Sequence, residues 1–196
     1  MMKRAFDVLA SALGLLVLAP LFAVVAVVIR LDSPGDVLFR QVRIGRNFKP
    51  FTILKFRTMV ADAEARGGQI TLGDEPRITR AGRLLRRLKI DEFPQLWNVL
   101  RGDMSLVGSR PEVPRYVELY RADFKAVLAA RPGITDPASI RFSNESELLG
   151  ASADPEREYR EKILPAKLAL SKDYARRSSL SSDVALILRT LLKISA

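Results

Sequence analysis

The sequence predicts a mainly α-helical protein with a small β-hairpin, folded as a single compact domain on an N-terminal re-entrant membrane helix. Residues Val8 to Ile29 form an uncharged and largely apolar run. Further along, two short strand-like segments surround one turn. Most of the remaining chain shows helical spacing of apolar residues between Pro and Gly breaks. We therefore expect residues 1–32 to be a re-entrant membrane helix and residues 33–196 to be a cytoplasmic, membrane-associated domain.

The uncharged run has 22 residues, and about 20 apolar residues cross a bilayer as a helix. Lys3 and Arg4 precede it and Arg30 follows it, whereas a crossing helix usually has its positive flank on one side only. Pro20 in its middle should bend a helix. We thus expect a kinked helix that enters and leaves by the cytoplasmic face, with Asp7 paired to Lys3 or Arg4. A straight spanning helix and a buried core helix are the alternatives.

The other elements follow from turn residues and apolar spacing. Two strands are expected at residues 37–44 and 51–56, around a Gly45-Arg46-Asn47 turn. Residues 68–76 read as a loop. Three helices are expected at residues 61–66, 79–88 and 94–100. A fourth should run through Val117, Tyr120, Phe124 and Val127, and a fifth should begin at Asp154-Pro155 and be broken or kinked by Pro165. The last should begin at Asp183, with Val184, Ile187, Leu188 and Leu191 on one face.

The composition limits the chemistry that the chain can perform. The 196 residues include 32 Lys and Arg against 22 Asp and Glu, for a net charge of +10, and they contain no His and no Cys. Thiol nucleophiles, Ser-His triads and zinc sites built on His or Cys are therefore excluded. Catalysis must use carboxylates, lysines, arginines, hydroxyls or a hard metal ion, and the positive charge favours anionic partners.

Basic residues concentrate just before an acidic pair. Six of them lie within 13 positions without an intervening acid: Arg77, Arg80, Arg83, Arg86, Arg87 and Lys89. Aromatic side chains that could stack on bases are absent from this run, so we expect no nucleic-acid partner. Membrane lipid headgroups or phosphorylated substrates fit better, and a solvated helix face is the plainer alternative.

The acidic pair is Asp91-Glu92, and Pro94 suits the first turn of a helix that follows it. Both carboxylates would then lie at a helix N-terminus, where the helix dipole favours the ionised form. Simple helix capping is the alternative function. With many arginines nearby, Asp91 is expected to be ionised at physiological pH, which suits a nucleophile or a magnesium ligand better than a general acid.

A loop returns the chain to another arginine. Gly102 and Gly108 flank the apolar piece Met104 to Val107, which leads to Arg110. Loop glycines allow a backbone to approach an anion closely, and Arg110 could bind a phosphate in a bidentate manner. No glycine-rich nucleotide-binding loop of a standard type is present.

The block DEFPQLWNVLRGDMSLVGSRPE resembles the signature of bacterial sugar transferases, the monotopic phosphoglycosyl transferases that begin glycan assembly on polyprenol phosphate. Other segments match in the same order: KRAFDVLAS, FRQVRIGRNFKPFTILKFRTM, PRITRAGRLLR and RPGIT. The resemblance covers nearly the whole chain and corresponds to the family's minimal catalytic core. It implies a location on the cytoplasmic face of the bacterial inner membrane and contact with membrane lipids.

The resemblance also implies a reaction and roles. A sugar-1-phosphate would pass from a UDP-sugar to polyprenol (undecaprenyl) phosphate, with Mg²⁺ as cofactor and release of UMP. Asp91 matches the covalent nucleophile of the family, and Glu92 matches a residue that assists in proton handling and in the metal site. The residues that match family positions for substrate phosphate or lie near the site are Arg110, Arg86, Lys55 and Arg57.

Some positions depart from the family pattern. Ser109 stands where many relatives have Pro, and DPASIRF follows Thr135 where many have a Gly-Trp-Ala-Gln type sequence. The sugar therefore stays open, as do the length of the polyprenol, the glycan pathway (exopolysaccharide, capsule, O-antigen or glycoprotein) and the oligomeric state, a homo-oligomer included. The rival function is a non-enzymatic, membrane-tethered basic module that binds anionic lipid or nucleic acid.

Overall fold

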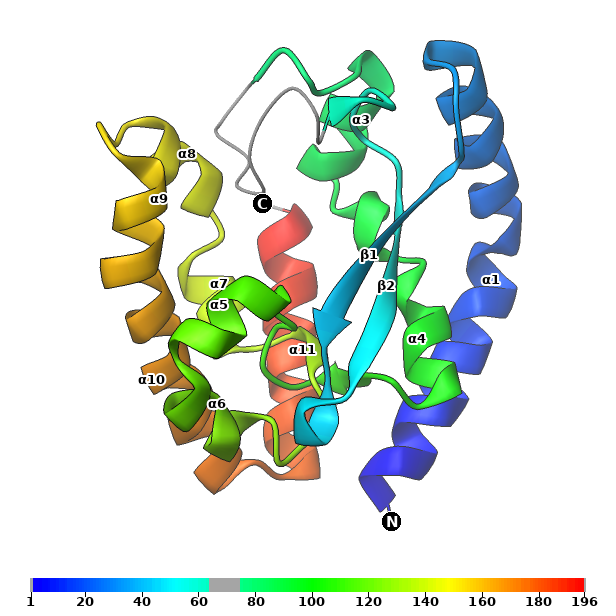
Figure 1. Cartoon of the computed structure of the whole chain (residues 1–196). Helices are drawn as coiled ribbons and strands as arrows, with labels where there is room; N and C mark the ends of the chain where they lie inside the picture. Colours follow the sequence, from blue (N-terminus) through cyan, green and yellow to red (C-terminus); the bar gives the residue numbers. More distant parts are fainter. Residues whose placement is uncertain (1, 64–74, 196) are drawn as a thin grey trace.

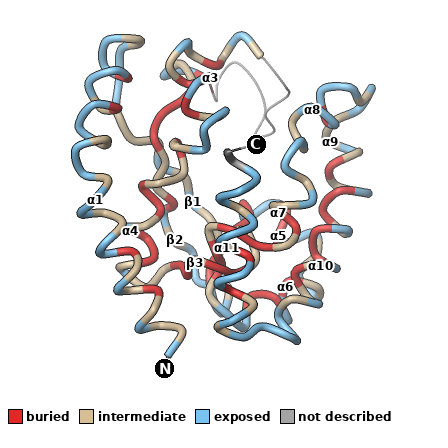
Figure 2. Tube along the Cα trace, turned by 180° about the vertical axis from the view of Figure 1, so that it is seen from behind, coloured by how far each residue is buried: buried red, intermediate tan, exposed pale blue. Residues whose placement is uncertain are grey.

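The computed structural model describes residues 2–63 and 75–195 of the chain. Helix α1 runs along one side, a long hairpin lies in the middle, and several short helices form the other side (Figure 1). Helix α11 lies between these two sides when the molecule is seen from behind (Figure 2). The predicted mainly helical class with one hairpin is confirmed.

The α-helices of the described residues are α1 Met2–Asp32, α3 Arg80–Arg87, α4 Gln95–Arg101, α5 Pro114–Leu119, α6 Arg121–Val127, α7 Pro137–Arg141, α8 Glu145–Gly150, α9 Pro155–Glu158, α10 Leu164–Arg177 and α11 Leu180–Ser195.

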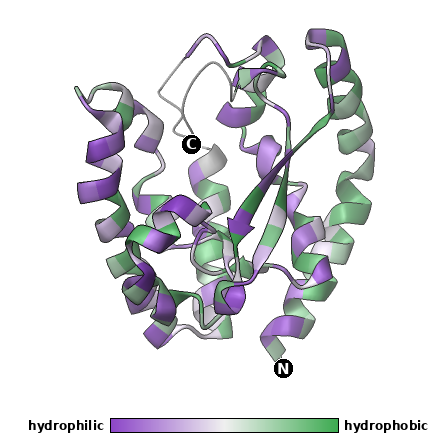
Figure 3. Ribbon diagram, in the orientation of Figure 1, coloured by the Kyte–Doolittle hydropathy of each residue, from purple (hydrophilic) through white to green (hydrophobic). Residues whose placement is uncertain are grey.

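Helix α1 is continuous through Pro20 and consists mainly of apolar residues (Figure 3), most of which are exposed. Its buried residues are Asp7, Ser11, Val25 and Ile29. They lie on one stripe, because their separations are close to whole turns of about 3.6 residues. By length and composition α1 could cross a membrane, and it is the single helix among the described residues that passes this test.

The rest of the domain holds both ends of α1. Near the N-terminal end, the Arg4 guanidinium donates to the carbonyls of Val99 and Leu100 at 2.7 and 3.0 Å. Near the other end, Ile29 packs against Phe56 and Leu85. The predicted pairing of Asp7 with Lys3 or Arg4 is wrong.

Each of these three polar side chains instead bonds to a distant segment. Asp7 accepts a hydrogen bond from the Leu106 amide at 3.1 Å, and Lys3 forms an ion pair with Asp183 of α11. The N-terminal turns of α1 thereby hold strand β3 (Ser105–Val107) and α11 against the same helix. At the C-terminal end, the Asp32 carboxylate accepts a hydrogen bond from the Ala81 amide in the first turn of α3 at 3.0 Å.

The hairpin joins strands β1 (Leu38–Ile44) and β2 (Pro50–Phe56), paired antiparallel with Leu38 opposite Phe56. Buried Asn98 ties the hairpin to α4. Its amide donates to the Thr52 carbonyl at 2.8 Å and its oxygen accepts from the Leu54 amide at 3.0 Å. These bonds fix the position of α4 relative to β2, which the sequence patterns did not reveal.

A second sheet, absent from the predictions, pairs β3 (Ser105–Val107) in parallel with β4 (Gly133–Thr135). Two glycines meet beside it. A Cβ on Gly133 would stand 2.0 Å from the Gly108 nitrogen, so only a residue without a side chain fits there. This close crossing gives Gly108 a structural use, and its approach to an anion stays a prediction. Gly102, with φ 94°, ends α4.

Other predictions need correction. The predicted helix through residues 117–127 is two helices, α5 and α6, which meet at Tyr120. Pro165 does not break the helix that Asp154 caps, because a π-turn over Tyr159–Ile163 joins α9 to α10 and Pro165 lies in the first turn of α10. On α11, the predicted apolar residues Val184, Leu188 and Leu191 are exposed, and Leu186 is buried. The predicted helix 61–66 and loop 68–76 fall mostly outside the described residues.

Candidate active site

The acidic pair lies in a tight turn between α3 and α4. Helix α3 ends at Arg87, and Lys89 adopts a left-handed conformation with φ 56° that turns the chain. A 3₁₀ turn over Ile90–Glu92 follows, and the Phe93 amide donates to the Ile90 carbonyl at 3.1 Å. The sharp reversal presents Asp91 and Glu92 toward strand β2, ahead of the first turn of α4, rather than as caps of that helix.

Glu92 is held between two cations. The Lys55 ammonium on β2 donates to Glu92 Oε1 at 2.8 Å. The Arg110 guanidinium, after β3, donates to Oε2 at 3.0 Å and also bonds Oε1. Burial alone would raise the pKa of Glu92, but the charges of Arg110 and Lys55 outweigh it and hold this pKa well below its ordinary value. Glu92 is therefore an ionised carboxylate and a weak proton acceptor in this arrangement.

Asp91 differs from its neighbour. Its Oδ1 atom is buried and accepts no hydrogen bond, and Asp91 makes no ion pair among the residues that the structure describes. Burial raises the pKa of Asp91, as does the charge of Glu92, while Lys55 and Arg86 lower it less. The shift runs opposite to the direction that arginine density alone suggests. A carboxylate with little solvation and no bonded partner keeps its lone pairs free for an incoming group.

Two further predicted residues are placed differently. Arg86 donates to the Thr58 hydroxyl at 2.8 Å, and its charge acts on Asp91, which places it beside the acidic pair. Arg57 is buried, and its guanidinium donates to backbone carbonyls of residues 33, 34 and 36 just after α1. These contacts give Arg57 a structural use, and its binding of phosphate stays a prediction.

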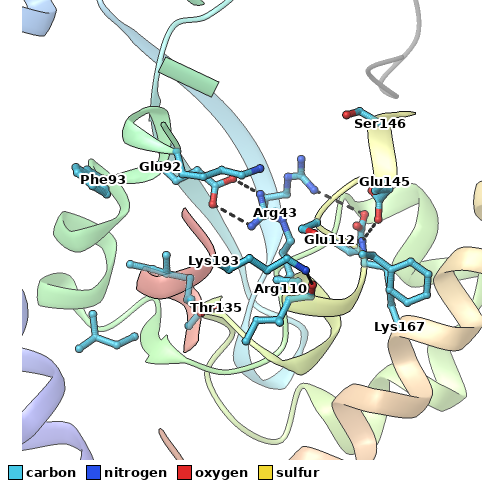
Figure 4. A pocket seen from close by; sticks show the side chains of 18 of the residues that line it. Arg43, Glu92, Phe93, Arg110, Glu112, Thr135, Glu145, Ser146, Lys167 and Lys193 are labelled. Carbon is cyan, nitrogen blue, oxygen red and sulfur yellow. Dashed lines mark hydrogen bonds and ion pairs between the residues drawn. The ribbon is translucent and has the colours of Figure 1, made fainter. Parts of the chain in front are cut away.

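A cavity of about 750 Å³ opens beside the pair, and Glu92 and Arg110 form part of its wall. Figure 4 shows charged side chains pointing into it from several elements. The Lys167 ammonium donates to Glu145 at 2.8 Å, and Lys193 of α11 donates to the Ile140 carbonyl at 2.7 Å. Asp91 lies next to this cavity in the chain but is not one of its lining residues.

The sequence reasoning missed a buried network in the same wall. Glu112 accepts a hydrogen bond from the Tyr159 hydroxyl at 2.6 Å and lies 3.7 Å from Arg43. Arg43 also donates to the Pro111 carbonyl at 3.2 Å, next to Arg110. Burial raises the pKa of Tyr159 and so does the charge of Glu112, so the tyrosine stays a donor. The network fixes the backbone that carries Arg110. Residues 43, 112 and 159 are far apart in the sequence, so only knowledge that they contact one another could have revealed it.

The oxygen donors suit a hard cation only in part. No cluster of three or more metal-binding side chains occurs in the described ranges. Asp91 has a free carboxylate oxygen, whereas both oxygens of Glu92 already bond to cations. This set fits a magnesium ion that takes one protein carboxylate and completes its shell with phosphate oxygens and water. Direct binding of a metal by Glu92 stays a prediction.

Comparison with known proteins gives one family and several relatives. The model of the family described as bacterial sugar transferase matches residues 1–196. A UDP-glucose:undecaprenyl-phosphate glucose-1-phosphate transferase of Caulobacter vibrioides is 42% identical over 193 residues, 96% of this chain and 68% of its own length. An exopolysaccharide production protein ExoY of Sinorhizobium fredii is 32% identical over 204 residues, 96% of this chain and 83% of its own.

A third relative is longer than this chain. The UDP-N-acetylgalactosamine-undecaprenyl-phosphate N-acetylgalactosaminephosphotransferase of Aeromonas hydrophila is 40% identical over 141 residues. The match covers 70% of this chain and 33% of that protein. The chain thus spans about a third of this relative and about two thirds of the one from Caulobacter.

The paired cations give a stability prediction. Glu92→Gln should lower the free energy of unfolding by about 3 kcal/mol, because it leaves Lys55 and Arg110 without their shared carboxylate. Lys55→Met should cost less in the Glu92→Gln background than in the wild type. Thermal unfolding in detergent measures both. Glu118→Gln, which removes an exposed ion pair with Arg121, is the control and should change little. Additive effects of the two substitutions would contradict the paired arrangement.

Proposed function

The chain belongs to the bacterial sugar transferase family and is a phosphoglycosyl transferase, and on that premise we propose that it moves a sugar-1-phosphate from a UDP-sugar to polyprenol phosphate. One observation supports this most: a buried Asp91 carboxylate without a bonded partner lies next to a Glu92 held by two cations. The names of the relatives suggest UDP-glucose and UDP-N-acetylgalactosamine as the first donors to test. A role in exopolysaccharide assembly is the first pathway to examine.

The proposed reaction has two steps at Asp91. First, an Asp91 carboxylate oxygen attacks the β-phosphorus of the UDP-sugar, the bond from that phosphorus to the UMP oxygen breaks, and UMP leaves. The product is an acyl-phosphate that carries the sugar. Second, a phosphate oxygen of polyprenol phosphate attacks the same phosphorus, which restores the carboxylate and yields polyprenyl-diphosphate-sugar. Burial favours the attack, because a poorly solvated carboxylate loses little water on the way to the transition state.

The cations around Glu92 have a part in this proposal. Arg110 presents its guanidinium to Glu92 in the arrangement described, and a diphosphate would compete for the same planar donor group. When Arg110 turns to the phosphate, Glu92 loses its largest stabilising charge and its pKa rises. Glu92 then becomes a better proton acceptor when the substrate is present. Lys55 remains beside Glu92 and limits that rise.

We propose magnesium as the cofactor, with Asp91 as its protein ligand. When bound, the ion neutralises charge on the diphosphate. Chelation of magnesium should abolish release of UMP and leave the protein on its membrane, because α1 does not depend on the ion. The measurements are UMP release and sedimentation with vesicles, with and without chelator. Unchanged UMP release in chelator contradicts the proposed cofactor.

We also propose that α1 is a monotopic element whose two ends lie on the cytoplasmic face. A helix of 31 residues is about 46 Å long at 1.5 Å per residue, longer than a bilayer core of about 30 Å. Yet one domain binds Lys3 and Arg4 at one end and Asp32 at the other. A helix that crossed the membrane would place these two sets of contacts on opposite sides.

Cysteine labelling tests this topology. Met2→Cys and Ser33→Cys, made singly, should react with an impermeant thiol reagent from the same side of sealed vesicles, and the chain has no native cysteine to interfere. The two ends flank α1, so a helix that stays on one face exposes both to one compartment. Asp36→Cys, in the loop that follows α1, serves as a marker of the domain's side. Reaction of the two sites from opposite sides would establish a spanning helix.

The covalent route predicts a burst. Incubation with a UDP-sugar in the absence of polyprenol phosphate should release about one equivalent of UMP per enzyme, because the first step needs no acceptor. Asp91→Asn should abolish both the burst and turnover, since an amide is a poor nucleophile, while Asp36→Asn, an exposed carboxylate, should retain both. Rapid-quench measurement of UMP checks this.

Other outcomes of this experiment identify the rivals. Release of UMP only after addition of the acceptor indicates direct transfer in one step and leaves Asp91 as a metal ligand that is not a nucleophile. A wild type that binds anionic vesicles but releases no UMP with any UDP-sugar, and an Asp91→Asn variant that binds them equally well, favour the non-enzymatic membrane module.

A further inference from the structure

The wall of the cavity beside Glu92 carries two chemically different sets of side chains. One set is charged and is shown in Figure 4. The other set is aliphatic and comes from elements far apart in the sequence: Leu18, Leu96, Leu106, Ile134, Ile187 and Leu191. A UDP-sugar carries hydroxyls and charge over most of its surface and gains little from such a wall. An isoprenoid chain, which has only apolar surface, gains from contact with all of it.

The aliphatic part continues onto exposed apolar surface. Leu18 belongs to α1, where the preceding residues Leu16 and Val17 are exposed. On α11, Leu191 lines the cavity and is still 55% exposed. Both helices therefore present apolar side chains to the outside and to the cavity. Leu18 thus joins the wall of the cavity to the helix that is suited to a membrane, and the same cavity reaches Glu92 and Arg110.

Helix α11 also supplies a charge. Ile187 and Leu191, about one turn apart on this helix, belong to the aliphatic lining residues. Lys193, near the C-terminal end of the helix, lines the same cavity. Arg110 lines it as well. A molecule with an isoprenoid chain and a phosphate would thus meet aliphatic side chains along its chain and cations at its head. Lys3, which pairs with Asp183 at the start of α11, fixes this helix against α1.

We infer that this cavity holds the part of the acceptor's isoprenoid chain next to its phosphate, with α11 as the outer wall of the acceptor site. The inference rests on the proposed function and extends it, because it assigns the cavity to the lipid and gives the C-terminal helix a role in acceptor choice. The remainder of the isoprenoid stays in the bilayer beside α1.

Leu191→Gln tests this inference. With undecaprenyl phosphate in detergent micelles of fixed composition, the variant should raise the KM for this acceptor about tenfold, because a polar amide replaces part of an apolar contact. The KM for the UDP-sugar should stay at the wild-type value. With the short acceptor farnesyl phosphate the effect should shrink, since less chain reaches the wall. Leu191→Met, which keeps an apolar side chain of similar volume, should restore the wild-type KM.

Leu188→Gln is the matched control. Leu188 lies on the same helix and is 56% exposed, close to Leu191, but does not line the cavity. It should leave both KM values unchanged, and circular dichroism should show the same helical content for every variant. Ile187→Gln, inside the cavity, should behave as Leu191→Gln does.

Three results would overturn the inference. A raised KM for the UDP-sugar instead of the acceptor would assign the cavity to the donor. Equal effects of Leu188→Gln and Leu191→Gln would make this face of α11 a membrane contact rather than an acceptor wall. Absence of turnover in the wild type with every UDP-sugar would remove the proposed function itself, a result separate from any difference between variants.

Discussion

The shared carboxylate of Glu92 is the interaction on which the site depends. It joins Lys55 of β2 to Arg110, which follows β3. Each approach has its own structural support. Asn98 fixes α4 against β2, and the crossing of Gly108 with Gly133 sets the path that carries Arg110. Both cations form their ion pairs with Glu92, and the adjacent Asp91 has no bonded partner.

The membrane helix and the site belong to one packed unit. Asp7 of α1 accepts from the backbone of β3, the strand that precedes Arg110. At the other end, Ile29 packs with Leu85 of α3, the helix that leads into the acidic pair. A shift of α1 would therefore be transmitted to both sides of the site. This coupling provides a physical reason for a phosphoglycosyl transferase to keep this apolar helix against the proposed catalytic residues: one of the two proposed substrates is soluble and the other is a lipid.

Local sequence patterns predicted the elements that depend on neighbouring residues. Alternation and a turn located the hairpin, apolar spacing with glycine and proline breaks located α3 and α4, and the Asp91-Glu92 pair was found by its charge. Contacts between residues far apart in the sequence could not be predicted from these local patterns. The parallel β3–β4 sheet joins three-residue strands almost 30 positions apart. Arg57 donates to backbone carbonyls whereas Arg110 donates to the Glu92 carboxylate, a difference in partners that a sequence does not show. The raised pKa of Asp91 likewise follows from burial, while charge counting favoured the opposite direction.

The separate roles of the two carboxylates are tested most directly by mass spectrometry. The enzyme is analysed after brief reaction with a UDP-sugar, with no lipid acceptor added. If Asp91 is the nucleophile and Glu92 is held by its cations, the mass of one sugar phosphate should appear on the peptide containing Asp91, and fragmentation should place it on that residue. It should disappear when polyprenol phosphate is added. A modification on Glu92, or no modification in an enzyme with normal turnover, would contradict this division.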